Sequence, residues 1–514
     1  MIRPISPQQR QSLVINACAF ATATLLLALV ALVGYMTWRG SAFIWPDPIY
    51  LVQYNEPDGE VKQAYAQWHK GAADNSTVRL SVSTSSRPYQ TQSILDASQF
   101  LFSEEVEQAA QIELVDGRTI LAVPAAVSDV NNAQLPLSEL SVQTRSEDII
   151  DRRIAYIRRV ELARLHENIA IYNRREVEAE APGRLQLEKA YAALQEELRL
   201  LEKKQQAYTL TVRFYDGETF SIQLADIARI TYPSTMSLPD KAKAAAISLW
   251  YFLTDSPKQA NTAGGVFPAL FGTVVMVFLM TIIVAPFGVL AAVYLHEYAP
   301  KNPFTAMLRI CVSNMAAVPS IVYGVFGLGF MVYTLGGQID SLFFADTLPN
   351  PTMGAPGLFW AAATMALLTL PVVIVATEEG LSRVPNSLRM GSYALGATKF
   401  ETVWRTVLPI ASPSMMTGLI LAIARAAGEV APLMLVGAVR FAPDLPIDGT
   451  FPYFHLDRQF MHLGVLIYDG AFNSQPDTKG AAMMFAACSL LLLVVLILNI
   501  VAVVLRTRLR ERYQ

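Results

Sequence analysis

The chain has 514 residues, of which 53% are hydrophobic and 16% are charged, and its formal net charge at pH 7 is -3. This composition is too apolar for an ordinary soluble protein and too polar for a protein wholly embedded in a membrane. It predicts a membrane bundle with one sizeable soluble domain. Cys18, Cys311 and Cys488 each lie in an apolar run, so a disulfide framework is not expected.

The first predicted element is a membrane helix over residues 13–36, within an N-terminal region 1–38. The apolar run exceeds the core of a cleavable signal peptide and has no clear small-x-small exit, so it predicts an uncleaved anchor. Arg3 and Arg10 precede the run. Positive residues before a first span favour a cytoplasmic N-terminus.

Residues 39–262 have the composition of a soluble domain. Two segments, 112–121 and 212–221, place Asp-Gly between alternating apolar runs, and a weaker third copy surrounds Asp58-Gly59. Asp-Gly supplies the positive φ angles of a tight turn, so a β-hairpin is expected at each of the two clear copies.

A charged helical hairpin is predicted between the two β-hairpins, over about residues 147–206. Apolar residues recur every three or four positions in two series: Leu162, Leu165, Ile169 and Tyr172, then Leu187, Tyr191, Leu194, Leu198 and Leu201. Pro182-Gly183 separates the series. Each arm of the antiparallel coiled coil would have about 25 residues and a length of about 40 Å. Its role is open between a solvated brace and a docking arm for a partner.

Five further membrane spans are predicted in the core region 263–514, at residues 267–294, 310–335, 358–376, 415–439 and 481–505. Lys and Arg residues cluster in the short loops after the second and fourth spans and after the last one. Six spans with both termini in the cytoplasm satisfy this distribution. The domain at 39–262 is then expected outside, and the loop 377–414 in the cytoplasm.

Polar residues inside the predicted spans are candidates for a substrate path. Arg425 and Glu429 lie in the fifth span, one helical turn apart, where each charge costs about 2.5–3.5 kcal/mol on insertion scales. They are interpreted either as an anion-attracting Arg with its counter-charge or as a helix-packing pair. The third span contains Asn314, Ser320 and Tyr323 beside Pro319 and Gly324. These residues suit a substrate-lining helix or ordinary hydrogen bonds between helices.

The stretch before Pro409 combines small residues with basic ones, which predicts a short surface helix that fits a groove of another protein. The small residues are Gly391, Ser392, Ala394, Gly396 and Ala397, and Leu408-Pro409 is expected to end the segment. The sequence Gly391-x-x-x-x-Gly396-Ala397-Thr398 imitates a phosphate-binding loop but lacks its Lys. His296-Glu297 is not followed by a second His one turn later, so the zinc-binding motif His-Glu-x-x-His is absent. Glu378, Glu379 and Arg383 are expected to be solvated. No catalytic residue, metal site or nucleotide site is predicted.

The same stretch resembles the coupling loop of ABC-importer permeases, whose pattern is Glu-Ala-Ala, three residues, Gly, nine residues and Ile-x-Leu-Pro. Gly396 and Leu408-Pro409 fall at the matching spacing, while Met390 takes the acidic position and Thr406 the Ile position. More broadly, the chain from Gly264 onward resembles the PstA-type permease subunits of bacterial phosphate ABC importers. The segments that carry this resemblance lie at 264–273, 285–299, 318–324, 384–398 and 424–433.

The resemblance implies an all-α membrane bundle of six transmembrane helices with the type I ABC-importer permease fold. The hairpin and helix patterns of residues 39–262 add an inserted α+β periplasmic domain, to which the family pattern gives no guide. The resemblance implies a place in the bacterial inner membrane and a second, PstC-type permease subunit. It also implies two PstB-type ATPases that bind ATP and Mg²⁺ and a PstS-type periplasmic phosphate-binding protein. No cofactor in this chain and no nucleic acid are expected, and the spans would contact membrane lipid. Arg425 and Glu429 match the family's charged pair.

The function expected from this resemblance is that of a non-enzymatic permease subunit for phosphate. ATP binding in the partners would move the loop at 390–409 and tilt the third to fifth helices. Two alternatives remain: a permease for another oxyanion such as sulfate or molybdate, and a membrane-anchored sensor or scaffold that uses the helical hairpin.

Overall fold

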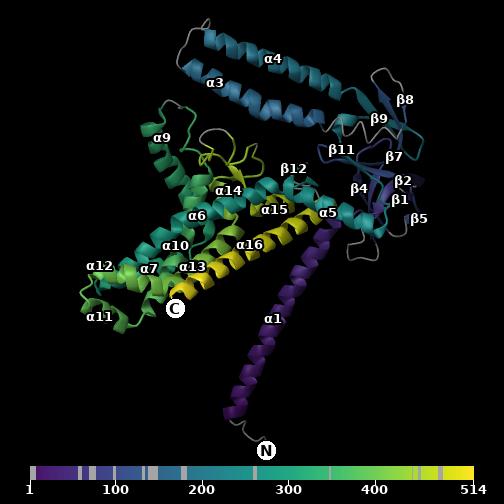
Figure 1. The fold of residues 1–514 in the computed structure, drawn as a ribbon. Helices are drawn as coiled ribbons and strands as arrows, with labels where there is room; N and C mark the ends of the chain where they lie inside the picture. Colours follow the sequence, from purple (N-terminus) through teal and green to yellow (C-terminus); the bar gives the residue numbers. More distant parts are fainter. Residues whose placement is uncertain are drawn as a thin grey trace, which may run out of the picture. The chain divides into compact units, whose positions relative to one another are not determined.

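A computed structural model of the chain describes residues 7–55, 61–68, 77–96, 100–129, 134–136, 149–174, 182–258, 263–345, 349–442, 444–449, 453–472 and 478–513. The chain divides into two compact units (Figure 1). One unit consists of Met1–Phe43 with Trp250–Gln514, and the other is Ile44–Leu249. The second unit is therefore inserted after the first long apolar helix. The weak Asp-Gly copy at 58–59 lies outside the described residues.

The inserted unit contains two antiparallel sheets. The five-stranded sheet has the order β4 (Thr91–Asp96), β3 (Thr77–Ser83), β2 (Val61–Trp68), β1 (Ile49–Asn55), β5 (Phe100–Glu105). The six-stranded sheet has the order β10 (Thr219–Gln223), β9 (Tyr208–Arg213), β7 (Thr119–Asp129), β6 (Ala110–Leu114), β11 (Ile227–Thr231), and β8 (Gln134–Leu135) pairs with β7. Alternating apolar residues of β6, β7 and β9, such as Ile112, Ile120 and Leu210, form the core of the second sheet.

Both predicted Asp-Gly segments lie in hairpins, β6–β7 and β9–β10. The expectation of positive φ angles at both Asp and Gly is wrong, because only the Gly of each turn has one, +93° at Gly117 and +83° at Gly217. The amide of Gly117 donates to the carbonyl of Leu114, and that of Gly217 to the carbonyl of Phe214. The carboxylates of Asp116 and Asp216 each accept from the amide two residues on. Asp therefore stabilises the turn through its side chain, and Gly provides the left-handed step.

The two helical arms of the inserted unit are antiparallel. Residues 149–174 are helical, with a π-helical segment at Ile157–Leu162 followed by α3 (Ala163–Arg174), and they pack against α4 (Pro182–Gln205). Arg158 pairs with Glu202 at 2.6 Å, and the rings of His166 and Tyr191 lie 5.0 Å apart. No residue of α4 is buried, so this arm remains largely open to solvent within the unit, whereas Ile154 and Ile157 of the other arm are buried.

Six helices in the described part of the other unit are long and apolar enough to cross a membrane, which confirms the predicted number of spans. They are Gln11–Ile44, Phe267–Tyr298, Ser320–Phe343, Leu358–Ser382, Lys399–Gly428 and Gly480–Arg508. The central one is α10 (Leu358–Ser382), which packs along α6 (Phe267–Val293) and α13 (Leu408–Gly428), as Figure 1 shows. Gly288 of α6 lies directly against Val373 of α10, so the two helices approach closely.

The remaining elements are short or lie at the ends of the spans. The first span belongs to α1 (Pro7–Ile44), and the last to α16 (Thr478–Tyr513). The shorter helices are α5 (Leu238–Thr254), α7 (Pro303–Met315), α8 (Ser320–Phe326), α9 (Gly337–Phe343), α11 (Asn386–Ala394), α12 (Lys399–Thr402), α14 (Ala431–Val436) and α15 (Leu463–Phe472). Two small ladders join β12 (Pro257–Lys258) to β13 (Ala263–Gly264) and β14 (Ala438–Val439) to β15 (Phe460–Met461).

The predicted third and fifth spans are each interrupted in the structure. Residues 310–315 belong to α7, and a new helix starts at Ser320 after Pro319. The helix of the fifth span ends at Gly428, Glu429 is extended, and α14 begins at Ala431. Pro319 and Pro432 lack an amide donor, so a helix loses a hydrogen bond at each and restarts there at little cost.

The boundary predicted after residue 38 is also displaced. The first helix, α1, continues through Gly40 and Ser41 to Ile44, two residues before Pro46. A Cβ on Gly40 would lie 2.7 Å from the backbone nitrogen of Ala486, so α1 approaches α16 closely at this point. Arg39 also lies over the Phe485 ring. This end of α1 therefore packs with the membrane helices.

Candidate functional site

The predicted charged pair lies at the end of a helix rather than within one. Arg425 occupies the last turn of α13, and Glu429 follows it with extended backbone angles, φ -80° and ψ 135°. Arg425 Nε is 3.4 Å from Glu429 Oε1, an ion-pair distance without hydrogen-bond geometry. The side chains are 36% and 22% exposed. The expectation that they share one helical face is wrong, yet the two charges still meet across the break.

The break after α13 lies beside the helix that starts at the other break. A Cβ on Gly324 of α8 would be 2.7 Å from the Cα of Pro432 in α14, so the two backbones cross in close contact. The Tyr323 hydroxyl donates to the carbonyl of Met315 at 2.8 Å, and this bond spans the gap between α7 and α8. Tyr323 itself is buried, and it lies on α8, the helix whose Gly324 contacts α14.

The other polar candidates of the third span lie at the same interruption. Asn314 is exposed near the end of α7, and Ser320 is half-buried at the start of α8. A separate cavity of about 480 Å³ lies between α7, α10 and α13, and its lining includes Ser313, Pro371, Ser414, Thr417 and Leu421. None of the five predicted path residues lines this cavity.

The predicted coupling segment begins with α11, which ends in a glycine cap. The amide of Gly396 donates to the carbonyl of Tyr393 at 2.9 Å, and that of Ala397 to the carbonyl of Ser392 at 3.2 Å. Gly396 has a φ of +86°. This bonding pattern closes a helix when a left-handed residue follows it, and Gly adopts that conformation most readily. Gly396 therefore has a backbone role, whereas Gly391 and Ala394 are exposed on α11.

The second part of the segment is continuous with the fifth membrane helix. Thr398 and Glu401 form a reciprocal cap at the start of α12, and a π-helical turn at Val403–Val407 leads into α13. Leu408-Pro409 therefore does not end the segment as predicted. Pro409 has no amide hydrogen to donate, and it lies in the first turn of α13, directly after the π-helical turn. The backbone hydrogen-bonding pattern changes there, so the missing donor does not break the helix. The Ser392 and Thr402 hydroxyls lie 2.9 Å apart and connect α11 to α12.

The segment exposes an unusual number of large apolar side chains. Phe400 and Trp404 stack with ring centroids 6.2 Å apart and are 67% and 60% exposed. Leu395 is 91% exposed and Met390 65%. We call these four residues the apolar loop face. Large apolar side chains that are this exposed indicate a surface that another molecule covers.

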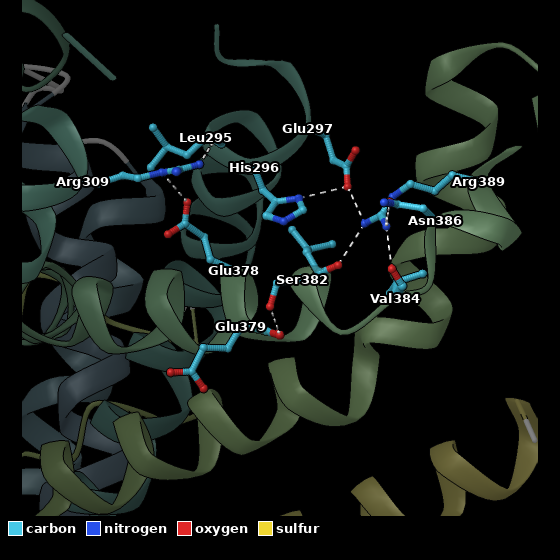
Figure 2. A network of polar contacts seen from close by, with 11 residues as sticks. Leu295, His296, Glu297, Arg309, Glu378, Glu379, Ser382, Val384, Asn386 and Arg389 are labelled. Carbon is cyan, nitrogen blue, oxygen red and sulfur yellow. Dashed lines mark hydrogen bonds and ion pairs between the residues drawn. The ribbon is translucent and has the colours of Figure 1, made fainter. Parts of the chain in front are cut away.

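A network of charges that the sequence did not reveal joins α11 to the membrane helices (Figure 2). Arg389 Nη2 lies 2.9 Å from Glu297 Oε1, and these side chains are only 12% and 9% exposed. Glu297 belongs to the π-helical turn Tyr294–Tyr298 that ends the second span, and His296 lies 3.0 Å from the same oxygen. In the sequence, His296-Glu297 is a weak signal of this site, because without a second His one turn later it indicates no metal.

A second ion pair lies on the other side of the same π-helical turn. Arg309 of α7 is 3.4 Å from Glu378 of α10 and donates to the carbonyl of Leu295 at 2.8 Å (Figure 2). Glu378 is therefore paired, contrary to the expectation of a solvated side chain. Glu379 and Arg383 are solvated as expected, at 64% and 74% exposure. Within the described residues, no group of three His, Cys, Asp or Glu side chains could hold a metal ion.

These features define a multi-pass membrane protein with two interrupted helices and a structured loop between its fourth and fifth spans. Residues 284–511 match the profile of the family described as "Binding-protein-dependent transport system inner membrane component". The chain is 35% identical over 244 residues to "Phosphate transport system permease protein PstA 1" of Mycobacterium tuberculosis (strain CDC 1551 / Oshkosh), a match that covers 48% of this chain and 71% of that protein. It is 32% identical over 257 residues to "Phosphate transport system permease protein PstA" of Yersinia pestis, covering 50% of this chain and 77% of that protein.

The chain therefore belongs to the PstA-type family of binding-protein-dependent transport permeases, as its resemblance predicted. Among solved structures, the inward-facing MetNI methionine ABC transporter is similar at 17% identity and a TM-score of 0.37, covering 53% of this chain and 99% of that chain.

Proposed function

We propose that this chain is the membrane-embedded permease subunit of an ATP-driven phosphate importer of a bacterial inner membrane. The similarity to phosphate permeases is the observation that carries this proposal, because it covers about 70% or more of those relatives. ATP hydrolysis would then belong to partner ATPases, which would also bind ATP and Mg²⁺. A second permease subunit and a phosphate-binding protein complete the proposed assembly. The two termini and the 377–414 loop would face the cytoplasm, and the inserted unit the periplasm.

Arg425 is the residue proposed to attract the anion. Its guanidinium is partly exposed and has a single carboxylate partner at 3.4 Å, so it retains donors for a passing oxyanion. Glu429 reduces the net charge, which would prevent the anion from being held too tightly. Because the two charges lie at a break between helices, a change in the angle between α13 and α14 would alter their separation.

The apolar loop face is proposed as the contact with the ATPases. Its aromatic pair and the exposed Leu395 supply the buried anchors that protein interfaces commonly use. The loop is continuous with α13 through the π-helical turn, and α13 ends at Arg425. One helix would therefore connect ATPase docking with the anion path.

The proposal is tested by phosphate uptake in cells that express the complete transporter, with Arg425→Gln, Glu429→Gln and the double variant. Arg425→Gln should abolish uptake while the complex still assembles. A role in anion attraction predicts that the double variant stays inactive, because the attracting charge is absent. A merely structural ion pair predicts recovery, because two neutral amides can pair at the same positions.

The matched control is Arg184→Gln, which breaks an i,i+4 pair with Glu188 on an exposed helix of the inserted unit. It should transport normally. Normal uptake by Arg425→Gln, or recovery in the double variant, would contradict the path role. Excess sulfate or molybdate that blocks uptake in the wild-type protein would instead favour a different oxyanion as substrate.

A further inference from the structure

Arg389 makes more polar contacts than its position on an exposed helix suggests. Besides Glu297, it donates to the carbonyl of Leu381 at 2.9 Å, to the carbonyl of Val384 at 2.6 Å and to the Asn386 side chain at 3.3 Å. Figure 2 shows the guanidinium between Glu297 and the carbonyl of Val384. A guanidinium has five donors in a rigid plane, so one side chain can satisfy all four acceptors.

Three of these acceptors come from the ends of two different membrane helices, whereas Asn386 belongs to α11 itself. Leu381 is in the last turn of α10, and Val384 lies two residues beyond the end of that helix. Carbonyls at a helix C-terminus lack intrahelical donors and carry partial negative charge, so a cation there is favoured. Glu297 lies at the end of the α6 helix, 92 residues earlier in the chain. Arg389 thus caps one membrane helix and binds the acid at the end of another.

The rest of α11 is attached more weakly. No residue of α11 is buried, and the helix packs mainly against α12 and the π-helical turn that follows it. The hydrogen bond between the Ser392 and Thr402 side chains joins α11 only to another part of the coupling segment. A displacement of α11 therefore either carries the ends of α6 and α10 with it or breaks the Arg389 contacts.

Breaking those contacts is unfavourable, because Glu297 would keep its charge in a site that leaves it only 9% exposed. Removing one partner of a buried ion pair leaves an uncompensated charge and is strongly destabilising. The π-helical turn that holds Glu297 is also restrained on its other side, where Arg309 binds the carbonyl of Leu295. π-helical turns are local distortions that often occur at functional sites.

We infer that Arg389 is a positioning residue that transmits movement of the ATPase-docking helix α11 to the ends of α6 and α10, with Glu297 as its receiving partner. This inference rests on the proposed function only for the identity of the partner that pushes on α11. It assigns a role to a basic residue next to Met390, the position at which the acidic residue of the family pattern is missing.

The test uses the complete transporter reconstituted in liposomes with its ATPases and binding protein. Three quantities are measured: recovery of ATPase subunits with the permease, the rate of ATP hydrolysis, and phosphate transported per ATP. Glu297→Gln keeps the carbonyl contacts of Arg389 and removes only the charge at the end of α6. We expect normal assembly and hydrolysis, with transport per ATP lower by about 10-fold, within the range that changes at coupling positions produce.

Glu379→Gln is the matched control, because it removes one carboxylate from an exposed pair on α10. It should leave all three quantities unchanged. If Glu297→Gln does not assemble, Glu297→Asp retains the charge at a longer distance, and it should assemble with reduced transport per ATP. Arg389→Lys keeps the positive charge but replaces the planar guanidinium with an ammonium, which cannot reach all of the acceptors of Arg389. We expect it to lower transport per ATP as well.

Unchanged transport per ATP in Glu297→Gln would overturn the inference. A parallel loss of assembly, hydrolysis and transport in Glu297→Gln, with fully normal coupling in Glu297→Asp, would also overturn it and leave a purely structural role. Failure of the wild-type transporter to move phosphate would refute the proposed function separately. Sulfate or molybdate transported per ATP would then report whether Glu297→Gln uncouples the docking helix.

Discussion

Two explanations are possible for the glycine at position 396 of the coupling segment. It could be needed because a side chain would collide with a partner, or because the backbone must turn. In this structure a Cβ at Gly396 would meet no atom within 4 Å, and the φ angle is +86°. The backbone explanation therefore predicts that Gly396→Ala weakens docking through strain alone.

The size of this effect follows from the cap geometry. An L-residue in the left-handed region costs about 1–2 kcal/mol relative to Gly. That energy corresponds to a change of about 5- to 30-fold in the population of the turn. If ATPase binding requires the turn, its apparent affinity falls by at most that factor. Asn tolerates the left-handed region better than Ala does, so Gly396→Asn should cost less although its side chain is larger.

The assay is equilibrium binding of purified ATPase subunits to the solubilised permease complex. The expected order of affinity is wild type, Gly396→Asn, then Gly396→Ala. Gly329→Ala is the control, because a Cβ there would also meet no atom within 4 Å and Gly329 lies in a helix outside the coupling segment, where Ala is favoured over Gly. An affinity for Gly396→Asn below that of Gly396→Ala would refute the reasoning, since it would show that side-chain size decides.

Two further predictions concern stability in the membrane unit and are measured by thermal unfolding of the purified complex. Asp340 is 1% exposed and accepts from the amides of Thr352, Met353 and Gly354 at 2.9, 2.7 and 2.7 Å. Asp340→Asn should lower the free energy of unfolding by about 1–3 kcal/mol, because an NH₂ group would replace one of the accepting oxygens. The control Asp444→Asn, at an exposed position, should have no effect. An equal loss of stability in both variants would contradict this prediction. Gly272→Ala would place a Cβ 2.2 Å from the carbonyl oxygen of Met461 and should lower the free energy of unfolding by about 1–3 kcal/mol or more. Gly329→Ala is its control and should not lower stability, because a Cβ there would meet no atom within 4 Å. Unchanged unfolding of Gly272→Ala would show that α6 can shift freely.

Much of the fold could be predicted because its signals are local. An apolar run of about 20 residues can satisfy its backbone in a membrane only as a helix, so the six spans were predictable. The Asp-Gly turns and the helical arms follow from alternation or three-and-four spacing within short segments. The ends of the helices were less predictable. Pro319 and Pro432 permit either a kink or a complete break, and the neighbouring backbone at Gly324 determines which occurs.

The candidate site likewise has a part that could be predicted from the sequence and a part that could not. Arg425 and Glu429 were identifiable from sequence because charges in an apolar run are costly and rare. Their meeting across a helix end depends on the break after Gly428, where Glu429 adopts an extended backbone. The pair Arg389–Glu297 gives only a weak signal in the sequence, since each charge lies at a helix end and its partner, 92 residues away, cannot be inferred from local spacing.

By itself, the sequence determined the class of protein, the number of spans, the inserted unit and the small-residue pattern of the coupling segment. These depend on hydrophobicity and turn chemistry within a few dozen residues. Only the tertiary structure decided that Arg389 joins α11 to the ends of α6 and α10. That contact requires Glu297, 92 residues away, to be carried to the same place by the packing of α6 against α10.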